Sequence, residues 1–333
     1  MAPTTFGRHD EHMRVVLELM PHVESLLPHL KTVEDSWQPS DLLPDFGGPA
    51  WREDLEALRR EGEGLSDEML VVLVGNIVTE EALPSYQAAL NRFGGITDRT
   101  GVDTHAWAQW SRGWTAEEKR HGDVTRAWLY LSGRVDMRAV ERTVQYLLRN
   151  GFDTGAGGDP YRGLAYASMQ EHATKTSWQQ LGSVVRRAGA PLLHRMCGLI
   201  AADEARHERV YRSIMVAIVD RDPEGALLAL RDTMGHVAMP AARMSDGSSR
   251  RLFQRFADVG RRLGVYDLND YADNLDGFIG ELGLETLGGL DGEAARHQEE
   301  ICRMPARYRE VAAGMDRQRT RPTAFPWIHD RLA

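Results

Sequence analysis

The sequence predicts an all-α protein built around a bundle of helices. Residues recur at the helical period along most of the chain, and no segment shows the alternating pattern of a strand. The motif Glu-x-x-His occurs twice, at residues 118–121 and 204–207, and each copy places a carboxylate and an imidazole on one helix face. A single glutamate on an earlier helical segment precedes each copy. This pattern predicts a site for two metal ions. The predicted ligands are Glu80, Glu118, His121, Glu171, Glu204 and His207.

The first two bundle helices are predicted from the residues at their ends. One helix should begin after Ser66, because a serine N-cap followed by two acidic residues favours a helix start. It should run through the first single glutamate towards Asn91. The second helix should begin at Asp103 or Thr104, carry the first motif and end near Gly133.

The later helices carry similar signals. A third helix is expected from about Asp136 to residues 150–151, where Asn-Gly is typical of a helix end. After a glycine-rich loop at residues 153–160, a fourth helix should carry the second single glutamate. Pro191 should begin a fifth helix, which carries the second motif, because proline is favoured in a first turn. The Asp-Pro-Glu at residues 222–224 should begin another helix.

The domain organisation follows from where these signals begin. Residues 1–48 contain several prolines and a Gly-Gly pair, so we expect an irregular arm that wraps around the rest of the chain. Residues 49–333 should form a single domain, and the metal-binding core of the bundle should span about residues 66–220.

Both motifs are expected to be buried, because the surrounding positions on their helix faces are apolar. Around the first motif these positions hold Trp107, Trp110, Trp114 and Trp128. Around the second they hold Ile200, Tyr211, Ile214 and Ile218. Buried carboxylates are costly unless compensated, and four of them balance the charge of two divalent metal ions. The alternatives are a chance match on a solvated face and a buried Glu–His network without metal.

Composition excludes several classes of protein. The chain has 333 residues, 42% of them hydrophobic, and a mean hydropathy of −0.42, so a large core needs no membrane span. A net charge of −9 argues against nucleic acid as the main partner. Cys197 and Cys302 are too few for a disulfide framework or a cysteine metal site. The start of the chain lacks the pattern of a signal peptide, so we expect a cytoplasmic protein.

Six strings of residues are distinctive enough to suggest a family. They are VEDSWQP at 33–39, TEEALP at 79–84, WTAEEKRHGD at 114–123, LYLSGRVDM at 129–137, AADEARHE at 201–208 and PWI at 326–328. In these strings the chain resembles the soluble acyl-acyl carrier protein desaturases best known from plant plastids. The resemblance covers about residues 33–331.

The resemblance implies a fold, a reaction and partners. The fold would be a ferritin-like di-iron bundle with additional C-terminal helices, assembled as a homodimer. The enzyme would use oxygen to introduce a cis double bond into a fatty acyl chain on acyl carrier protein. The six ligands named above would hold two irons, although ligand type alone also allows manganese. Electrons would come from ferredoxin, since the sequence has no flavin or nicotinamide fingerprint.

Docking of acidic partners would require local basic patches. The candidates are Arg186-Arg187, Arg250-Arg251-Arg255 and Arg261-Arg262. Arginines on helices are more often simply solvated, which is the alternative for each group.

Four further residues are candidates for supporting roles. Thr174 lies one turn after the second single glutamate, where its hydroxyl could relay a proton or merely bond its own backbone. The resemblance implies Asp203 as the partner of a metal-bound histidine, with Trp37 completing an electron route. The alternative for Trp37 is core packing. Tyr211, four residues after His207, is either a redox tyrosine or simply packed.

Three residues depart from the plant pattern. Lys175 and Trp178 stand where an apolar residue and a histidine are expected, and Arg92 stands where a small residue would line the acyl channel. Lys175 and Arg92 either shape the channel or extend to the surface. Chain length and double-bond position therefore stay open.

Three other functions compete with desaturation. A ribonucleotide reductase small subunit shares the ligand pattern and a tyrosine near it, an iron-storage protein shares the bundle, and a di-iron hydroxylase would act on a similar substrate. The sequence also leaves open whether the acyl carrier is acyl carrier protein or coenzyme A.

Overall fold

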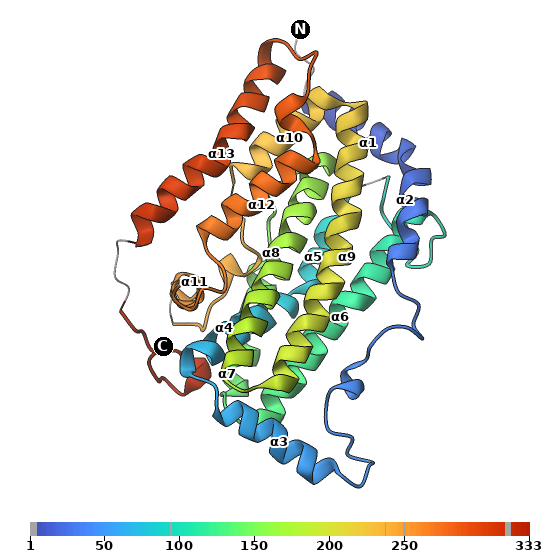
Figure 1. Cartoon of the computed structure of the whole chain (residues 1–333). Helices are drawn as coiled ribbons and strands as arrows, with labels where there is room; N and C mark the ends of the chain where they lie inside the picture. Colours follow the sequence, from blue (N-terminus) through green and yellow to red (C-terminus); the bar gives the residue numbers. More distant parts are fainter. Residues whose placement is uncertain (1–4, 94, 237, 249–250, 317–320) are drawn as a thin grey trace.

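The chain folds as layers of helices around a central bundle (Figure 1). The computed structural model describes residues 5–93, 95–236, 238–248, 251–316 and 321–333. Within these ranges the regular structure is α-helix and short 3-10 helix, and the one exception is an isolated β-bridge between Ala324 and Leu332. The predicted all-α class is confirmed.

Four helices form the bundle: α4 (Asp67–Glu80), α6 (Ala106–Ser132), α8 (Pro160–Arg187) and α9 (Pro191–Arg221). The two longest, α8 and α9, run side by side along most of their length (Figure 1). A tight turn joins them, in which Gly189 has a φ of 81°, a conformation that favours glycine. The apolar faces of these helices meet at the middle of the molecule, where the Glu-x-x-His motifs lie.

Side-chain caps fix the starts of several helices as predicted. The Ser66 hydroxyl accepts a hydrogen bond from the Met69 amide at the start of α4. Asp136, Asp159 and Asp222 cap α7 (Met137–Asn150), α8 and α10 (Pro223–Met234) in the same way.

Two predicted boundaries were wrong. The helix that carries Glu80 ends at that residue, and a separate helix α5 (Leu83–Leu90) follows. Pro84 is the physical reason, since a proline within a helix clashes with the carbonyl of the residue four positions earlier. Helix α6 begins after His105 rather than Asp103 or Thr104, because the His105 ring nitrogen accepts a hydrogen bond from the Ala108 amide.

The amino-terminal stretch was predicted to be irregular, and this was wrong for its first part. It forms α1 (Thr5–Glu18) and α2 (Met20–Leu26), which bury Val15, Val16, Leu19 and Val23. Pro21 lies in the first turn of α2, where a missing amide proton costs nothing. Residues 30–50 contain only a short 3-10 helix, and α3 (Trp51–Glu63) follows.

The C-terminal helices cover one side of the bundle. Helices α10, α12 (Leu268–Glu281) and α13 (Gly292–Asp316) pack together beside α8, and α11 (Leu252–Leu263) packs on α4 (Figure 1). Buried apolar residues form two clusters, and tryptophans from both border the motifs: Trp37 and Trp178 from one, Trp110 and Trp114 from the other. Across the described ranges, every helix is too short or too polar to serve as a membrane span.

Candidate metal centre

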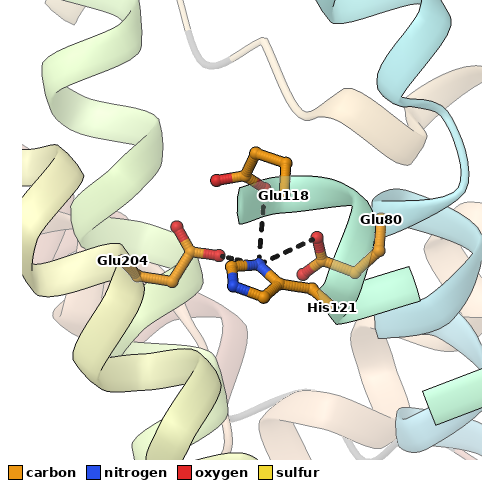
Figure 2. Close-up of side chains that lie close together, drawn as sticks. All are labelled: Glu80, Glu118, His121 and Glu204. Carbon is orange, nitrogen blue, oxygen red and sulfur yellow. Dashed lines mark ion pairs between the residues drawn. The ribbon is translucent and has the colours of Figure 1, made fainter. Parts of the chain in front are cut away.

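The fold brings all six predicted ligands to one buried place. Two overlapping groups have ligand atoms within 4.8 Å of one another: Glu80, Glu118, His121 and Glu204 form one, and Glu118, Glu171, Glu204 and His207 form the other. Figure 2 shows the first group, in which carboxylates from α4, α6 and α9 converge on the His121 ring. The six side chains come from all four helices of the bundle.

The first group is arranged around Nδ1 of His121. This nitrogen lies 3.3 Å from Glu204 Oε1, 3.4 Å from Glu118 Oε2 and 3.9 Å from Glu80 Oε2 (Figure 2). Three carboxylate oxygens and one imidazole nitrogen therefore face a common point.

The second group mirrors the first around Nδ1 of His207. This nitrogen lies 2.8 Å from Glu118 Oε1, 3.5 Å from Glu171 Oε2 and 3.9 Å from Glu204 Oε2. Glu118 and Glu204 thus direct one oxygen to each imidazole, whereas Glu80 and Glu171 each face only one. With two metal ions bound, Glu118 and Glu204 would be bridging carboxylates, and Glu80 and Glu171 would be terminal ones.

Burial and mutual repulsion strongly affect the ionisation of this cluster. Burial raises the pKa of Glu80 and of Glu171 well above the usual carboxyl range, and the neighbouring Glu204 charge adds to this effect. Burial opposes protonation of His121, but the surrounding carboxylates outweigh it and hold the pKa of that imidazole well above its usual value. The metal-free cluster therefore gathers protons.

The donor set fits a pair of metal ions. Four buried atoms that face the centre have no hydrogen-bond partner among the described residues: Glu118 Oε1, His121 Nδ1, Glu204 Oε1 and His207 Nδ1. Glu118 Oε1 and His207 Nδ1 are close but not oriented for a hydrogen bond with each other. Unpaired buried polar atoms are costly, and cations would satisfy all four. Oxygen and nitrogen donors without thiolate suit iron or manganese.

Each imidazole is held from behind by a carboxylate of the opposite helix. His207 Nε2 lies 3.0 Å from Glu117 Oε2, and His121 Nε2 lies 3.5 Å from Asp203 Oδ2. The hydrogen bond to Glu117 keeps the His207 proton on Nε2 and leaves Nδ1 free to bind metal, and the Asp203 charge favours the same arrangement at His121. Asp203 was predicted for this role. Glu117 was missed, although the sequence holds the signal, since an acidic residue precedes the motif glutamate in both copies.

Arginines complete this cross-pairing between α6 and α9. Arg120 donates to Asp203 over 3.1 Å, and Arg206 donates to Glu117 over 2.7 Å. Burial would raise the pKa of Glu117, but hydrogen bonds from His207 and Arg206 lower it to about 2. Both acids therefore stay ionised behind the histidines.

Comparison with known proteins gives the family. The profile of the fatty acid desaturase family matches residues 11–329. The chain belongs to this family. It is 46% identical to stearoyl-[acyl-carrier-protein] 9-desaturase 1 of Oryza sativa subsp. indica, over 92% of this chain and 82% of that one. It is 45% identical to acyl-[acyl-carrier-protein] 6-desaturase of Thunbergia alata, over 92% and 80%.

A solved structure agrees with the fold. The acyl-ACP desaturase DesA2 of Mycobacterium tuberculosis H37Rv superposes with a TM-score of 0.54 at 17% identity, over 82% of this chain and 96% of that one. The family match and the relatives at 45–46% identity confirm the predicted acyl-acyl carrier protein desaturase family, and with it an oxidoreductase. Membership in this family also decides against the reductase-subunit and iron-storage alternatives.

Trp37, Asp203 and His121 are in mutual contact. The Trp37 indole donates to Asp203 Oδ2 over 2.9 Å, and its ring stacks on His121 with centroids 6.2 Å apart. Tyr211 packs edge-on against Trp110 and Trp114, with centroids 5.7 and 6.5 Å away. Its hydroxyl is buried, which raises the pKa of this phenol far above its usual value.

Two mostly apolar cavities meet at the carboxylates of the desaturase. The first lies between α4, α8 and α11, and its wall includes Trp178, Phe253 and Phe256. The second lies between α5, α6 and α8, and its wall includes Tyr86 and Phe93. Residues of both walls are Thr79, Glu80, Gln170, Thr174 and Pro240.

The structure locates the three departures from the plant pattern. Lys175 bonds to Glu208, and Arg92 is exposed, with a 3.4 Å contact to the Thr154 hydroxyl. Neither side chain is in the wall of these two cavities. The interpretation that they shape the channel directly is therefore wrong for these walls. Trp178 does lie in the wall.

Proposed function

We propose that the chain introduces a cis double bond into a fatty acyl chain carried by acyl carrier protein, in a reaction that uses oxygen. The observation that carries this proposal is the meeting of two apolar cavities at the carboxylate cluster. An extended acyl chain that passes through both cavities would pass Thr174 and lie against the proposed metal ligands. The relatives named for stearoyl-[acyl-carrier-protein], from rice and from Ricinus communis at 44% identity, support the same substrate class.

Two irons are the proposed cofactors. Glu118 and Glu204 would bridge them, Glu80 and His121 would complete one metal's ligands, and Glu171 and His207 would complete the other's. When bound, the pair supplies the activation of dioxygen that removal of hydrogen from an unactivated alkyl chain requires. The cavity walls hold the chain in place and exclude water from it.

Thr174 is a proposed catalytic residue, because it lies in both cavity walls one turn from Glu171. Its hydroxyl donates to the Gln170 and Glu171 carbonyls, each over 3.1 Å. The oxygen can still accept a hydrogen bond from a group in the cavity, so the side chain can orient a donor beside the ligands.

Ferredoxin is the proposed electron donor. From the cluster, His121 contacts Asp203, and Asp203 accepts a hydrogen bond from Trp37. The Lys31 side chain, one-third exposed, lies 3.6 Å from Asp203. This side of the molecule therefore offers a short route and a cation to an acidic protein.

Acyl carrier protein is the proposed carrier of the substrate, and basic surface residues support its docking. Arg186 and Arg187 are exposed at the end of α8. Arg255, predicted for the same role, is instead engaged within the chain, with Asp246 and the Ala324 carbonyl. Arg251, Arg261 and Arg262 also have partners within the chain, and Arg250 lies outside the described residues.

The proposal includes a homodimer in the cytoplasm and a single domain at residues 49–333 preceded by an arm. Both cysteines are free thiols, which favours a reducing compartment. Burial raises the pKa of the Cys197 thiol to about 12, so it is inert. Sedimentation of the purified protein should give the mass of a dimer.

The reaction is tested by mass spectrometry of products. Metal-loaded protein receives reduced ferredoxin, oxygen and saturated acyl carrier proteins of graded length. We expect a product that has lost two hydrogens, with a cis double bond at one position, and much less product from the same chains on coenzyme A. An added oxygen atom would indicate hydroxylation instead. No oxidation of any chain would contradict the proposal.

A further inference from the structure

Two tryptophans connect the cavities to the terminal carboxylates. Trp178 is 1% exposed in the wall of the first cavity, and its indole donates to Glu80 Oε1 over 2.8 Å. Trp114 lies in the wall of the second cavity, and its indole donates to Glu171 Oε1 over 3.0 Å. Each cavity thus has one aromatic wall residue bonded to one terminal glutamate.

In each terminal glutamate, one carboxylate oxygen contacts an indole and the other faces an imidazole. In Glu80, Oε1 accepts the indole proton and Oε2 faces His121. In Glu171, Oε1 accepts from the other indole and Oε2 faces His207. A hydrogen bond to a charged carboxylate in a buried site fixes the plane of that group. The indole position therefore sets where the second oxygen points.

The bridging carboxylates are held differently. Glu118 and Glu204 each lie between the two imidazoles, and those imidazoles are backed by Asp203 and Glu117. Glu118 and Glu204 also lie in the wall of the second cavity, but among the described residues no wall side chain donates a hydrogen bond to either of them. Of the six clustered residues, within the part of the chain that the structure describes, only Glu80 and Glu171 accept a hydrogen bond from a side chain that is also part of a cavity wall, and in both cases that side chain is an indole.

We propose that Trp178 and Trp114 are positioning residues that link filling of the acyl cavities to the orientation of Glu80 and Glu171. An acyl chain contacts the indole rings directly, and any shift of a ring moves the carboxylate bonded to its N–H. A ligand changes a site only through contacts that differ between states, and these rings supply such contacts. Substrate binding thereby alters the metal ligands before reaction. The inference rests on the proposed function.

Cobalt spectroscopy tests this link without turnover. Co²⁺ replaces iron, and its visible absorption is recorded without oxygen before and after addition of stearoyl-acyl carrier protein, whose binding is measured separately. In the parent protein we expect the absorption to change when the acyl carrier binds. Trp178→Phe keeps an aromatic wall but removes the donor, so it should lose much of this change and bind Co²⁺ about 10-fold more weakly. Trp114→Phe should also lose part of it.

Two variants serve as controls. Trp178→His restores an N–H donor and should recover most of the spectral change. Trp107→Phe makes the same substitution at a buried indole of α6 that donates to the Val16 carbonyl instead, and it should behave as the parent.

The outcomes separate this inference from the proposed function. An unaltered spectral change in both Trp178→Phe and Trp114→Phe, or no change in the parent despite bound acyl carrier, overturns the link and leaves the desaturase proposal intact. Failure of the parent to bind Co²⁺ or the acyl carrier contradicts the proposed function itself. Loss of Co²⁺ from Trp178→Phe but not Trp178→His supports the anchoring role.

Discussion

At the scale of single residues, the contacts of a side chain decide which of its possible roles it can fill. Thr174 has its proton bound to its own helix, yet the residue lies in the walls of both cavities. It touches no predicted ligand side chain by a hydrogen bond in the described structure. Its contribution should therefore appear in the reaction and not in metal binding.

Replacement of Thr174 by valine tests this separation. Thr174→Val preserves shape and removes the hydroxyl, so iron content should stay near that of the parent. Desaturation should slow, or electrons should be diverted into peroxide and water, because a polar contact beside the ligands is lost. Product formed per electron consumed is the measurement. Equal yields in variant and parent would remove Thr174 from the mechanism.

Lys175 and Arg92 lead to the opposite expectation. Lys175 is bound to Glu208, and the exposed Arg92 contacts the wall residues Phe93 and Thr154 without itself being in a wall. Changing either side chain should therefore leave the cavity walls in place. Lys175→Phe and Arg92→Thr should each keep the acyl-length preference and double-bond position of the parent. Products from acyl carriers of graded length provide the check. A shifted profile in either variant would return that residue to the channel.

At the scale of elements, an ion-pair network joins α8 to α9. Glu208 of α9 contacts His172 of α8 over 2.6 Å and Arg212 over 3.1 Å, and it also bonds Lys175. Burial would raise the pKa of Glu208, but these partners lower it to about 2. Between about pH 2 and 4.5, the Glu208 carboxylate is therefore ionised in the folded chain, whereas the same group is largely protonated in the unfolded chain.

The pH dependence of stability follows with a definite sign. Since the folded pKa of Glu208 is depressed, its contribution is present above about pH 4.5 and is lost as pH falls towards 2. The shift corresponds to at most about 3 kcal/mol. In Glu208→Gln, the free energy of unfolding of the metal-free protein should be lower near pH 6 and should depend less on pH between these limits. Denaturant titrations at several pH values measure this. Parallel pH profiles for variant and parent would show that Glu208 contributes nothing.

At the scale of the whole molecule, the sequence was sufficient for the bundle and for the six clustered residues. Short-range rules explain this success, because helix spacing puts Glu118 and His121 on one face and capping residues mark the helix starts. That Glu118 and Glu204 each face both imidazoles could not be predicted, since this depends on how α6 and α9 face each other.

The failures have physical causes as well. Pro21 and Pro84 both lie in the first turn of a helix, α2 and α5, that begins just after another helix ends. A proline in the sequence therefore marked a helix start at both places and not an irregular segment. The hydrogen bond from Trp178 to Glu80 joins residues 98 positions apart, so no local pattern announces it. Side-chain direction, which decides between channel and surface for Lys175, also depends on the neighbouring helix.

Iron titration with a product readout tests whether desaturation by this chain depends on two bound irons. Metal-free protein is reconstituted with increasing Fe²⁺, and bound iron and desaturated product are measured on the same samples. Product should rise until about two irons are bound per chain, as a dinuclear site requires. Glu118→Ala and His207→Ala should bind little iron and form little product. A protein that holds one zinc ion per chain and shows no iron-dependent oxidation would contradict the di-iron proposal.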